Sequence, residues 1–215
     1  MGTIERNEKL IKVKKDEIVE AMEKALLSKS YDRLTIEDVA REAEYTKKTI
    51  YTYFNSKDEI YLELIDRKFN LLNEKIEKAV INSSSTGLEK IRIIGKTYFD
   101  FAKEFPEYMQ AIINFDIGRN SEAVTKSKAI EKFYNDTEKS FLLLANAVRE
   151  GIAEGSISQN ADVTSTAITL WSGINGFIML EYKKGTHLKN YYNKSMVELF
   201  DYSMKIILNS LRTID

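Results

Sequence analysis

The sequence contains no cysteine, one proline, one histidine and nine glycines among its 215 residues. The lack of cysteine excludes disulfide bonds, thiolate metal ligands and cysteine nucleophiles. So little proline and glycine argues against an all-β fold, whose many turns need these residues. The chain also shows no phosphate-binding glycine loop, no nucleophile motif and no glutamate–histidine pair at metal-ligand spacing, and His187 fits a solvated loop. We therefore expect no catalytic residues, no metal site and no cofactor.

Long apolar runs are also scarce, and no run of about 18 apolar, uncharged residues of the kind that spans a bilayer is evident. The N-terminus is basic but carries no apolar core of signal-peptide length. Hydrophobic residues make up 43% of the chain and charged residues 30%, which is a globular composition. We expect a soluble, cytoplasmic protein with no membrane partner.

Positive charge is concentrated in two segments, although the formal net charge is only -1. The first fifteen residues hold five basic and two acidic side chains, and residues 47–57 hold three lysines and no acid. A protein that binds nucleic acid needs positive charge only where it touches phosphate. We interpret the N-terminal run as a solvated extension and the second segment as the candidate nucleic-acid surface.

Almost every segment repeats its apolar residues with the period of a helix, which predicts an all-α fold of about nine helices. The polar run 82–87 is the clearest linker, and residues 183–186 are expected to separate the last two helices. We predict a domain of residues 1–60 and a larger one of residues 61–215. Helices are expected near residues 14–30, 35–43, 47–54, 56–80 and 88–104. A further helix is expected to begin at Pro106, and others near 122 or 128 to 153, 163–182 and 191–211.

Three short-range patterns mark helix starts in the first domain. Thr35 is an expected N-cap with Asp38 three residues on, and Thr46 can cap the next helix. Ser56 followed by Glu59 fits a capping box. Two short helices joined by a tight turn therefore lie between the first helix and a long fourth one.

Helix, short turn, helix is the geometry that places a second helix in the major groove of DNA. Residues 35–43 are the expected supporting helix and residues 47–54 the expected recognition helix. Ile50 and Phe54 anchor the recognition helix inward, which leaves lysines, hydroxyls and tyrosine phenols exposed. These groups donate hydrogen bonds to phosphates or base edges. Helical pairs in ordinary bundles satisfy the same pattern, so on its own it is only moderately specific.

The run TIEDVAREAEYTKKTIYTYFNSKDEIYLELI resembles the signature of TetR-family regulators over about residues 16–65. The matching positions include the Thr46 cap, the segment 50–54 and the opening 56–60 of the fourth helix. The resemblance implies that Tyr51, Tyr53 and Lys57 contact phosphates and that Lys47, Lys48 and Thr49 approach base edges, with Thr52 a weaker candidate. The implied DNA-binding set is Thr35, Thr46, Lys47, Lys48, Thr49, Tyr51, Thr52, Tyr53 and Lys57.

One residue departs from the family pattern, because Glu44 stands where such proteins usually have glycine. The turn is therefore expected to hold a non-glycine residue at positive φ, strained by about 1 kcal/mol. Glu44 also brings negative charge to the expected DNA surface.

The resemblance further implies a homodimer formed by the last two helices, and hence a pseudo-palindromic operator. Both helices carry wide apolar faces, although burial within one chain is an equally ordinary explanation. The final helix offers Met196, Leu199, Phe200, Ile206, Ile207 and Leu211. The preceding helix offers Ala167, Leu170, Ile174, Phe177 and Ile178, with Gly173 and Gly176.

The family also implies a small-molecule effector bound in the helical body, and an apolar or amphipathic one suits the side chains there. Aromatic residues at helical spacing are also common in plain cores. The candidate ligand-binding residues are Phe101, Phe105, Met109, Ile113, Asn114, Phe141, Leu144, Trp171, Asn175 and Met179. The predicted function is a dimeric repressor that leaves double-stranded operator DNA when the effector binds. The alternatives are an enzyme, a helical interaction protein and a transcriptional activator of the same fold.

Overall fold

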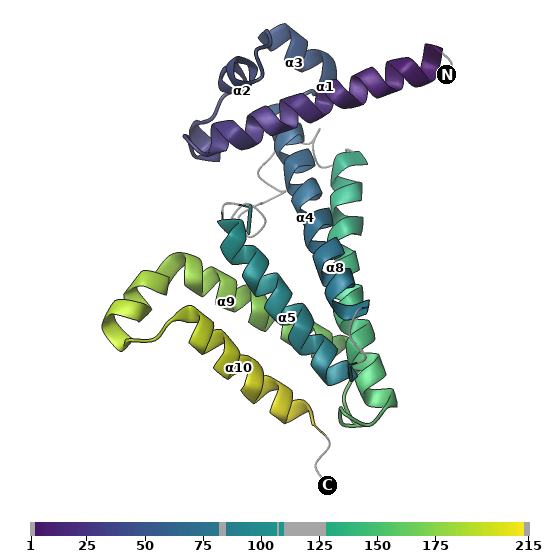
Figure 1. The fold of residues 1–215 in the computed structure, drawn as a ribbon, viewed down its shortest axis with the longest axis vertical. Helices are drawn as coiled ribbons and strands as arrows, with labels where there is room; N and C mark the ends of the chain where they lie inside the picture. Colours follow the sequence, from purple (N-terminus) through teal and green to yellow (C-terminus); the bar gives the residue numbers. More distant parts are fainter. Residues whose placement is uncertain (1–2, 82–84, 107, 110–127, 213–215) are drawn as a thin grey trace. The chain divides into compact units, whose positions relative to one another are not determined.

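The computed structural model describes residues 3–81, 85–106, 108–109 and 128–212 (Figure 1). Within these ranges every regular element is helical, which confirms the predicted all-α class, with eight α-helices against the nine or so expected. The elements are α1 (Thr3–Leu26), the short 3₁₀ helix η1 (Tyr31–Arg33), α2 (Ile36–Glu42), α3 (Lys47–Tyr53), α4 (Lys57–Ile81), α5 (Gly87–Glu104), α8 (Lys128–Ala153), α9 (Val163–Tyr192) and α10 (Met196–Leu211).

The first of two compact units contains α1, η1, α2, α3, the first turns of α4 up to Lys68, and residues 128–134 of α8. Its core forms because α1 presents apolar residues three and four positions apart, and these meet the apolar sides of α2 and α3. Ion pairs between Arg67 and Asp16 (2.6 Å) and between Lys68 and Glu23 (2.9 Å) fasten α4 to α1. Fully or nearly fully buried side chains here include Ile18, Met22, Val39, Ile50 and Ile60.

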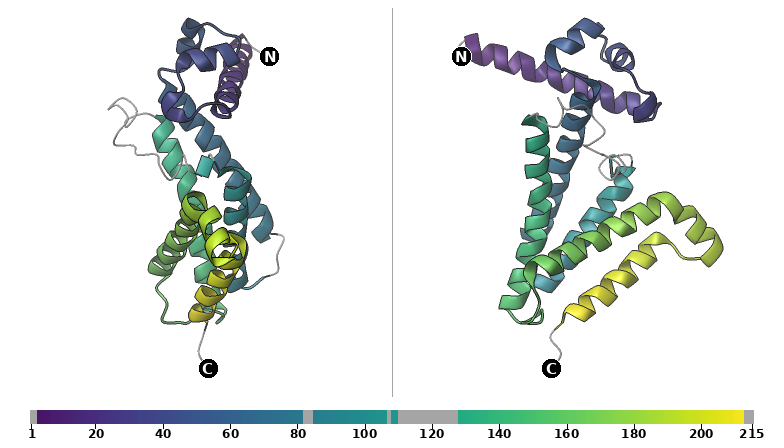
Figure 2. Two further views of the ribbon diagram at one scale, coloured as in Figure 1. Left: turned by 90° about the vertical axis from the view of Figure 1, so that its left-hand side faces the viewer. Right: turned by 180° about the vertical axis from the view of Figure 1, so that it is seen from behind.

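The second unit contains α4 from Phe69 onward, α5, α8 from Asn135, α9 and α10. The rings of Phe99 on α5 and Phe200 on α10 stack with centroids 4.2 Å apart. The start of α5 approaches α8 so closely that a Cβ on Gly87 would lie 2.2 Å from the backbone nitrogen of Gly151. Only glycine fits at this crossing. Helices α9 and α10 run side by side in opposite directions (Figure 2).

Two predicted helix boundaries are wrong. Helix α1 begins at Thr3 instead of near residue 14, and α9 continues through residues 183–186 to Tyr192. Gly185 is accommodated in α9 because one glycine in a helix costs only about 1 kcal/mol among residues that favour helix. The chain instead turns at Asn193, whose φ is 53°. His187 consequently lies on α9, stacked on Tyr191, and not in a loop.

One helix bears on the expectation about membrane-spanning segments. Within the described residues, α9 is long and apolar enough, by length and composition, to cross a membrane. Core helices of soluble proteins pass the same test, so one such helix is weak evidence for a span.

Candidate nucleic-acid interface and ligand pocket

Helix α2 starts with a complete capping box. The Asp38 backbone N–H donates to Thr35 Oγ1 (3.3 Å), and the Thr35 backbone N–H donates to Asp38 Oδ2 (3.0 Å). The Thr35 hydroxyl donates to the same carboxylate at 2.9 Å. Aspartate therefore serves in this box where glutamate is more usual. Thr35, a predicted DNA contact, has its hydroxyl engaged in the cap.

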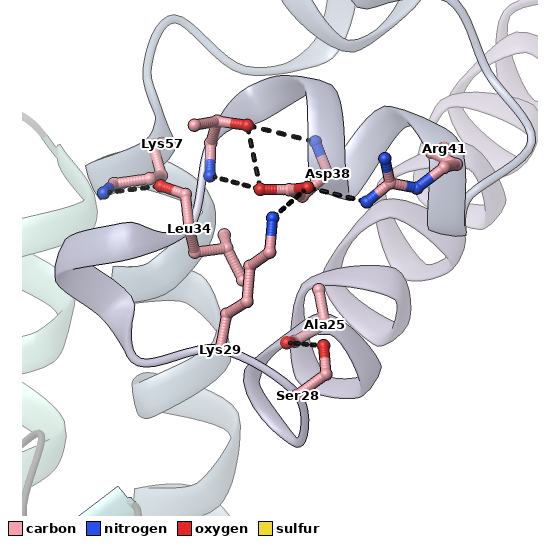
Figure 3. A network of polar contacts seen from close by, with 8 residues as sticks. Ala25, Ser28, Lys29, Leu34, Asp38, Arg41 and Lys57 are labelled. Atoms are coloured by element: carbon pink, nitrogen blue, oxygen red, sulfur yellow. Dashed lines mark hydrogen bonds and ion pairs between the residues drawn. The ribbon is translucent and has the colours of Figure 1, made fainter.

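The Asp38 carboxylate also joins α2 to the end of α1 (Figure 3). It lies 2.6 Å from Lys29 Nζ and 2.6 Å from Arg41 Nη2, and only 6% of the residue is exposed. The hydrogen bond from Lys29, followed by those from Thr35 and Arg41, holds the pKa of Asp38 well below its usual range. Charge-assisted bonds to a carboxylate are among the stronger hydrogen bonds in proteins. The supporting helix is thereby fixed in place for α3.

The turn between α2 and α3 is built on a left-handed residue. Glu44 has φ of 56°, which confirms the positive φ predicted for this position. The chain reverses here so tightly that the Tyr45 N–H donates to Ala40 O at 2.8 Å. The Tyr45 hydroxyl bonds both Lys14 and Glu17 of α1. The bond of Lys14 to Tyr45, followed by its own bond to Glu17, raises the pKa of Lys14. The turn is thus anchored to α1 despite its strain.

Helix α3 begins at the predicted cap and buries the predicted face. The Thr49 N–H donates to Thr46 Oγ1 (3.1 Å), and the two hydroxyl oxygens are 2.8 Å apart. Ile50 is 0% and Phe54 3% exposed. The Thr52 hydroxyl donates to its own helix, at Lys48 O (3.1 Å). The hydroxyls of α3 therefore complete the helix as well as offering groups to a partner.

The outward face of α3 carries two lysines and two tyrosines. Lys47, Lys48 and Tyr51 are exposed, and Tyr53 is half-buried. Lys47 forms an ion pair with Glu37 of α2, which raises the pKa of Lys47 and lowers that of Glu37. In the part of the chain that the structure describes, the Lys48 ammonium makes no hydrogen bond, ion pair or cation–π contact. Lys48 is therefore the free cation of this face.

Helix α4 starts with half of the predicted capping box. The Glu59 N–H donates to Ser56 Oγ at 3.1 Å. The Glu59 carboxylate does not return this bond to Ser56, because it accepts from the backbone N–H of Asn55 (2.7 Å) and from its side-chain amide (2.9 Å). The cap thus extends one residue upstream and also orders the link from α3.

Lys57 lies against the chain segment of η1 (Figure 3). Its ammonium donates to Leu34 O at 3.0 Å. It also donates to Tyr31 O (2.9 Å) and lies 4.1 Å from the centroid of the Tyr31 ring. Tyr31 in turn stacks on Tyr61, donates to Asp58, and has its pKa raised by burial and by that bond. Burial raises the pKa of Tyr61 to about 12. The structure thus gives Lys57 bonds within the unit, beside its predicted role at phosphate.

These observations define a class of protein. A short capped helix crosses a second helix whose outward face presents cations, hydroxyls and phenols, and whose inner face is buried. This is the helix-turn-helix arrangement of DNA-binding proteins. A free lysine and tyrosine hydroxyls on one helix face can reach both phosphate oxygens and base edges.

The chain belongs to the TetR family of transcriptional regulators. Residues 15–64 match the family of bacterial regulatory proteins named after TetR, and residues 91–205, more than half of the chain, match the tetracyclin repressor-like C-terminal domain. The protein is therefore a ligand-responsive transcriptional repressor with an N-terminal helix-turn-helix and a C-terminal ligand-binding domain.

Similar proteins and solved structures agree with this class. The chain is 24% identical over 148 residues to the fatty acid metabolism regulator protein of Bacillus subtilis, covering 68% of this chain and 72% of that one. Its fold is similar to that of the fatty acid degradation regulator FadR from Bacillus halodurans (TM-score 0.69, 18% identity, 92% and 99% of the two chains). FadR from Bacillus subtilis in complex with stearoyl-CoA is equally similar (TM-score 0.69, 18% identity, 91% and 98%). These relatives are regulators and not enzymes.

The second unit contains a pocket of about 240 Å³ between the end of α5 and α9. Phe99, Met109 and Ile178 are buried in its wall, and the exposed Lys103 and Lys183 stand among its polar residues. An apolar wall with a few charged groups suits an amphipathic small molecule. The lining consists of Phe99, Ala102, Lys103, Pro106, Met109, Ile178, Met179, Glu181, Tyr182 and Lys183.

Two of the ten predicted ligand residues, Met109 and Met179, line this pocket. Phe101 and Leu144 are core residues, at 2% and 0% exposure. Ile113 and Asn114 lie outside the described residues. The remaining four pack against other residues of the unit. Phe105 contacts the Phe101 ring, and Phe141 contacts the Trp171 ring. The Asn175 side chain donates to the Trp171 backbone carbonyl and accepts from the Tyr98 hydroxyl at 3.4 Å.

The other lining residues were missed, although a pattern for them exists. Positions 99, 102, 103 and 106 share one helical face, as do positions 178, 179 and 182. The spacing identifies each of the two faces. It does not show that the two faces lie opposite each other, which is what makes them the walls of one pocket.

The last two helices divide their apolar residues between the core and the surface. Their inward residues are Ala167, Leu170, Ile174, Ile178, Met196, Phe200, Met204 and Leu208. Ile168 and Ile206 are each 52% exposed and Tyr202 is 65% exposed. A Cβ added at Gly176 would meet no atom within 4 Å. Burial within the chain therefore explains one face and leaves a second apolar face on α9 and α10.

Proposed function

We propose that the exposed face of α3 binds operator DNA, with Lys48 at a base edge and Tyr51 at a phosphate. The observation that carries the proposal is the free Lys48 ammonium on a helix whose opposite side is anchored by Ile50 and Phe54. Lys47 and Tyr53 flank it, and the capped hydroxyls of Thr46 and Thr49 lie at the start of the same helix. Because DNA is reached inside the cell, we also propose a cytoplasmic location.

Fluorescence anisotropy against DNA from the upstream intergenic region of its own gene tests this proposal. Lys48→Ala should weaken operator binding by about tenfold or more, since one good base contact contributes about 1–3 kcal/mol. Tyr51→Phe should weaken operator and random DNA alike, as expected for a lost phosphate contact. The matched control is Lys24→Ala, an exposed lysine in the last turn of α1. Equal losses in Lys48→Ala and Lys24→Ala would contradict a specific role for Lys48.

We propose that the effector is an anionic amphiphile with a long acyl chain. The apolar wall of the pocket suits the part of the chain that enters it, and Lys103 and Lys183, against the one carboxylate of Glu181 in the lining, suit a negatively charged head group. The stearoyl-CoA complex of the Bacillus subtilis FadR supports the same chemical class. A ligand that binds better to a conformation unable to hold operator shifts the dimer away from DNA.

Calorimetric titration with stearoyl-CoA, stearate and free CoA tests the effector class. Stearoyl-CoA should bind and CoA alone should not, because the acyl chain supplies the burial. Lys103→Glu should weaken stearoyl-CoA binding severalfold, whereas Lys205→Glu, an exposed lysine on α10 outside this pocket, should not. Equal affinity for CoA and stearoyl-CoA would refute the acyl assignment.

We propose that the exposed apolar face of α9 and α10 forms the homodimer interface, which two-fold symmetry would match to a pseudo-palindromic operator. The surface contains Ile168, Tyr202 and Ile206, and Gly176 leaves room for a close neighbour. Sedimentation equilibrium should show a dimer for the wild type and mostly monomer for Ile206→Glu. Lys205→Glu changes charge one residue away and should remain dimeric; a dimeric Ile206→Glu would move the interface elsewhere.

A further inference from the structure

The ligand pocket has an exposed side and a buried side. Lys103 on α5 and Lys183 on α9 are exposed members of its lining. Phe99, one helical turn before Lys103, is 1% exposed, and Ile178 on α9 is 4% exposed. A ligand whose charged group meets the two lysines therefore directs its apolar chain along α5 toward Phe99.

A pair of stacked rings closes the buried side. The ring of Phe99 faces that of Phe200 on α10, with centroids 4.2 Å apart and 8° between the ring planes. Phe177 of α9 packs edge-on against Phe200, at 5.9 Å and 90°. Phe200, like Phe99, is only 1% exposed. Because rings from three helices pack closely on one another, Phe200 keeps the Phe99 ring from moving away from the pocket.

A second cavity lies on the other side of this stack. It is a groove of about 390 Å³ between the first half of α5 and α10, and Phe200 lines it together with Leu88, Met204 and Leu208. Phe99 lines the pocket and Phe200 lines the groove, and neither residue lines both. The stacked pair therefore separates the two cavities of this unit.

We propose that the Phe99–Phe200 pair is the barrier that sets the longest acyl chain the pocket accepts, which makes these two residues the determinants of chain-length specificity. The inference rests on the proposed function, since it takes an acyl amphiphile as the effector. Each methylene that enters the apolar pocket lowers the Kd about fourfold, at roughly 0.8 kcal/mol per buried CH₂. A methylene that meets the stacked rings gains nothing, because closely packed side chains leave it no space.

Calorimetric titration of the full-length protein with saturated acyl-CoAs, from octanoyl-CoA to arachidoyl-CoA, tests this barrier. The measured quantity is the chain length at which the Kd stops falling. Phe200→Ala leaves room for the Phe99 ring to move out of the pocket and should shift this length to longer chains. Within the added range, each further carbon should lower the Kd by up to about fourfold. A general loss of stability weakens the binding of every chain and does not move the length limit.

Two further variants keep the test independent of folding defects. Phe200→Leu removes less of the core and should shift the limit in the same direction by a smaller amount. The matched control is Phe101→Leu, because Phe101 is 2% exposed, two residues from Phe99, and packs against Phe105 outside the pocket lining. This control should leave the chain-length limit where the wild type has it.

A parallel titration with straight-chain alcohols tests the same barrier without the CoA head group. An unchanged limit in both Phe200 variants, an equal shift in Phe101→Leu, or a wild-type Kd that falls without limit overturns the inference. If no acyl-CoA binds the wild type, the proposed effector class fails instead. The alcohol series then decides the barrier alone, by the presence or absence of a length limit that Phe200→Ala moves.

Discussion

Lys47, the first residue of the recognition helix, is ion-paired with Glu37 on the supporting helix. Both side chains are about half exposed, at 51% and 59%. The pair leaves neighbouring Lys48 as the unpaired cation of this face. In the proposed complex, a carboxylate on α2 would compete with DNA phosphate for Lys47.

Glu37→Gln should therefore tighten DNA binding. The variant releases Lys47 and removes a negative charge from the DNA-binding unit, and the loss of an exposed pair is worth about 0.2–1 kcal/mol, or up to about fivefold in Kd. Anisotropy titrations at two salt concentrations measure the effect, which should shrink at high salt. Glu20→Gln, on the exposed side of α1, is the charge-matched control. An unchanged Kd for Glu37→Gln would show that Lys47 does not contact DNA.

The strained turn provides a prediction that separates stability from affinity. Glu44→Gly should raise the free energy of unfolding by about 1 kcal/mol, because glycine accepts positive φ without steric cost. Glu44→Ala keeps the β-carbon and should give no such gain. Both variants lose the same carboxylate and should tighten DNA binding to the same small extent. Urea unfolding and anisotropy measure the two effects, and a stability gain in the alanine variant would locate the strain elsewhere.

Lys57 is predicted to stabilise the fold. Lys57→Met removes a charged donor from two backbone carbonyls and should lower the free energy of unfolding by about 2 kcal/mol. Lys48→Met removes a lysine without such bonds and should change stability by less than about 0.5 kcal/mol. Thermal and urea unfolding compare the two. If Lys57→Met keeps wild-type stability and loses only DNA affinity, Lys57 acts at phosphate alone.

Asp38 should make the stability of the DNA-binding unit sensitive to acid. The pKa of Asp38 in the folded protein lies below its value in the unfolded chain. Its contribution to the free energy of unfolding is therefore complete above about pH 4 and is lost as the pH falls toward the folded pKa. Asp38→Asn should thus be less stable than wild type at pH 7, with the difference closing in acid. Urea unfolding across this pH range measures the difference. The stability of Lys29→Gln should lie between that of the wild type and that of Asp38→Asn. A difference that stays constant with pH would exclude this linkage.

Local features of the DNA-binding unit were predictable because they depend on neighbours in the chain. The caps at Thr35 and Thr46, the buried face of Ile50 and Phe54, and positive φ at Glu44 all follow from spacings of a few residues. Residues three or four apart share a helix face, and a cap needs a hydroxyl three residues before its donor. Such rules require no knowledge of the tertiary fold.

Helix ends and pairings across the chain were harder to predict. The run through residues 183–186 reads as a break, yet α9 continues, because one glycine costs only about 1 kcal/mol and does not by itself end a helix. The partner of a charged side chain was equally unpredictable: Lys57 faces Tyr31 and Leu34, and Lys47 faces Glu37. These contacts join residues that sequence spacing does not relate.

The sequence by itself determined the helical class, the helix-turn-helix and which face of α3 is buried, because each rests on short-range periodicity and capping. Only the tertiary structure decided which apolar residues line a pocket and which fill the core. Phe99 and Phe101 are both aromatic, nearly fully buried and two residues apart, yet one lines the pocket and the other packs against Phe105. That difference depends on which helix packs against each face of α5, and periodicity along one helix does not contain this information.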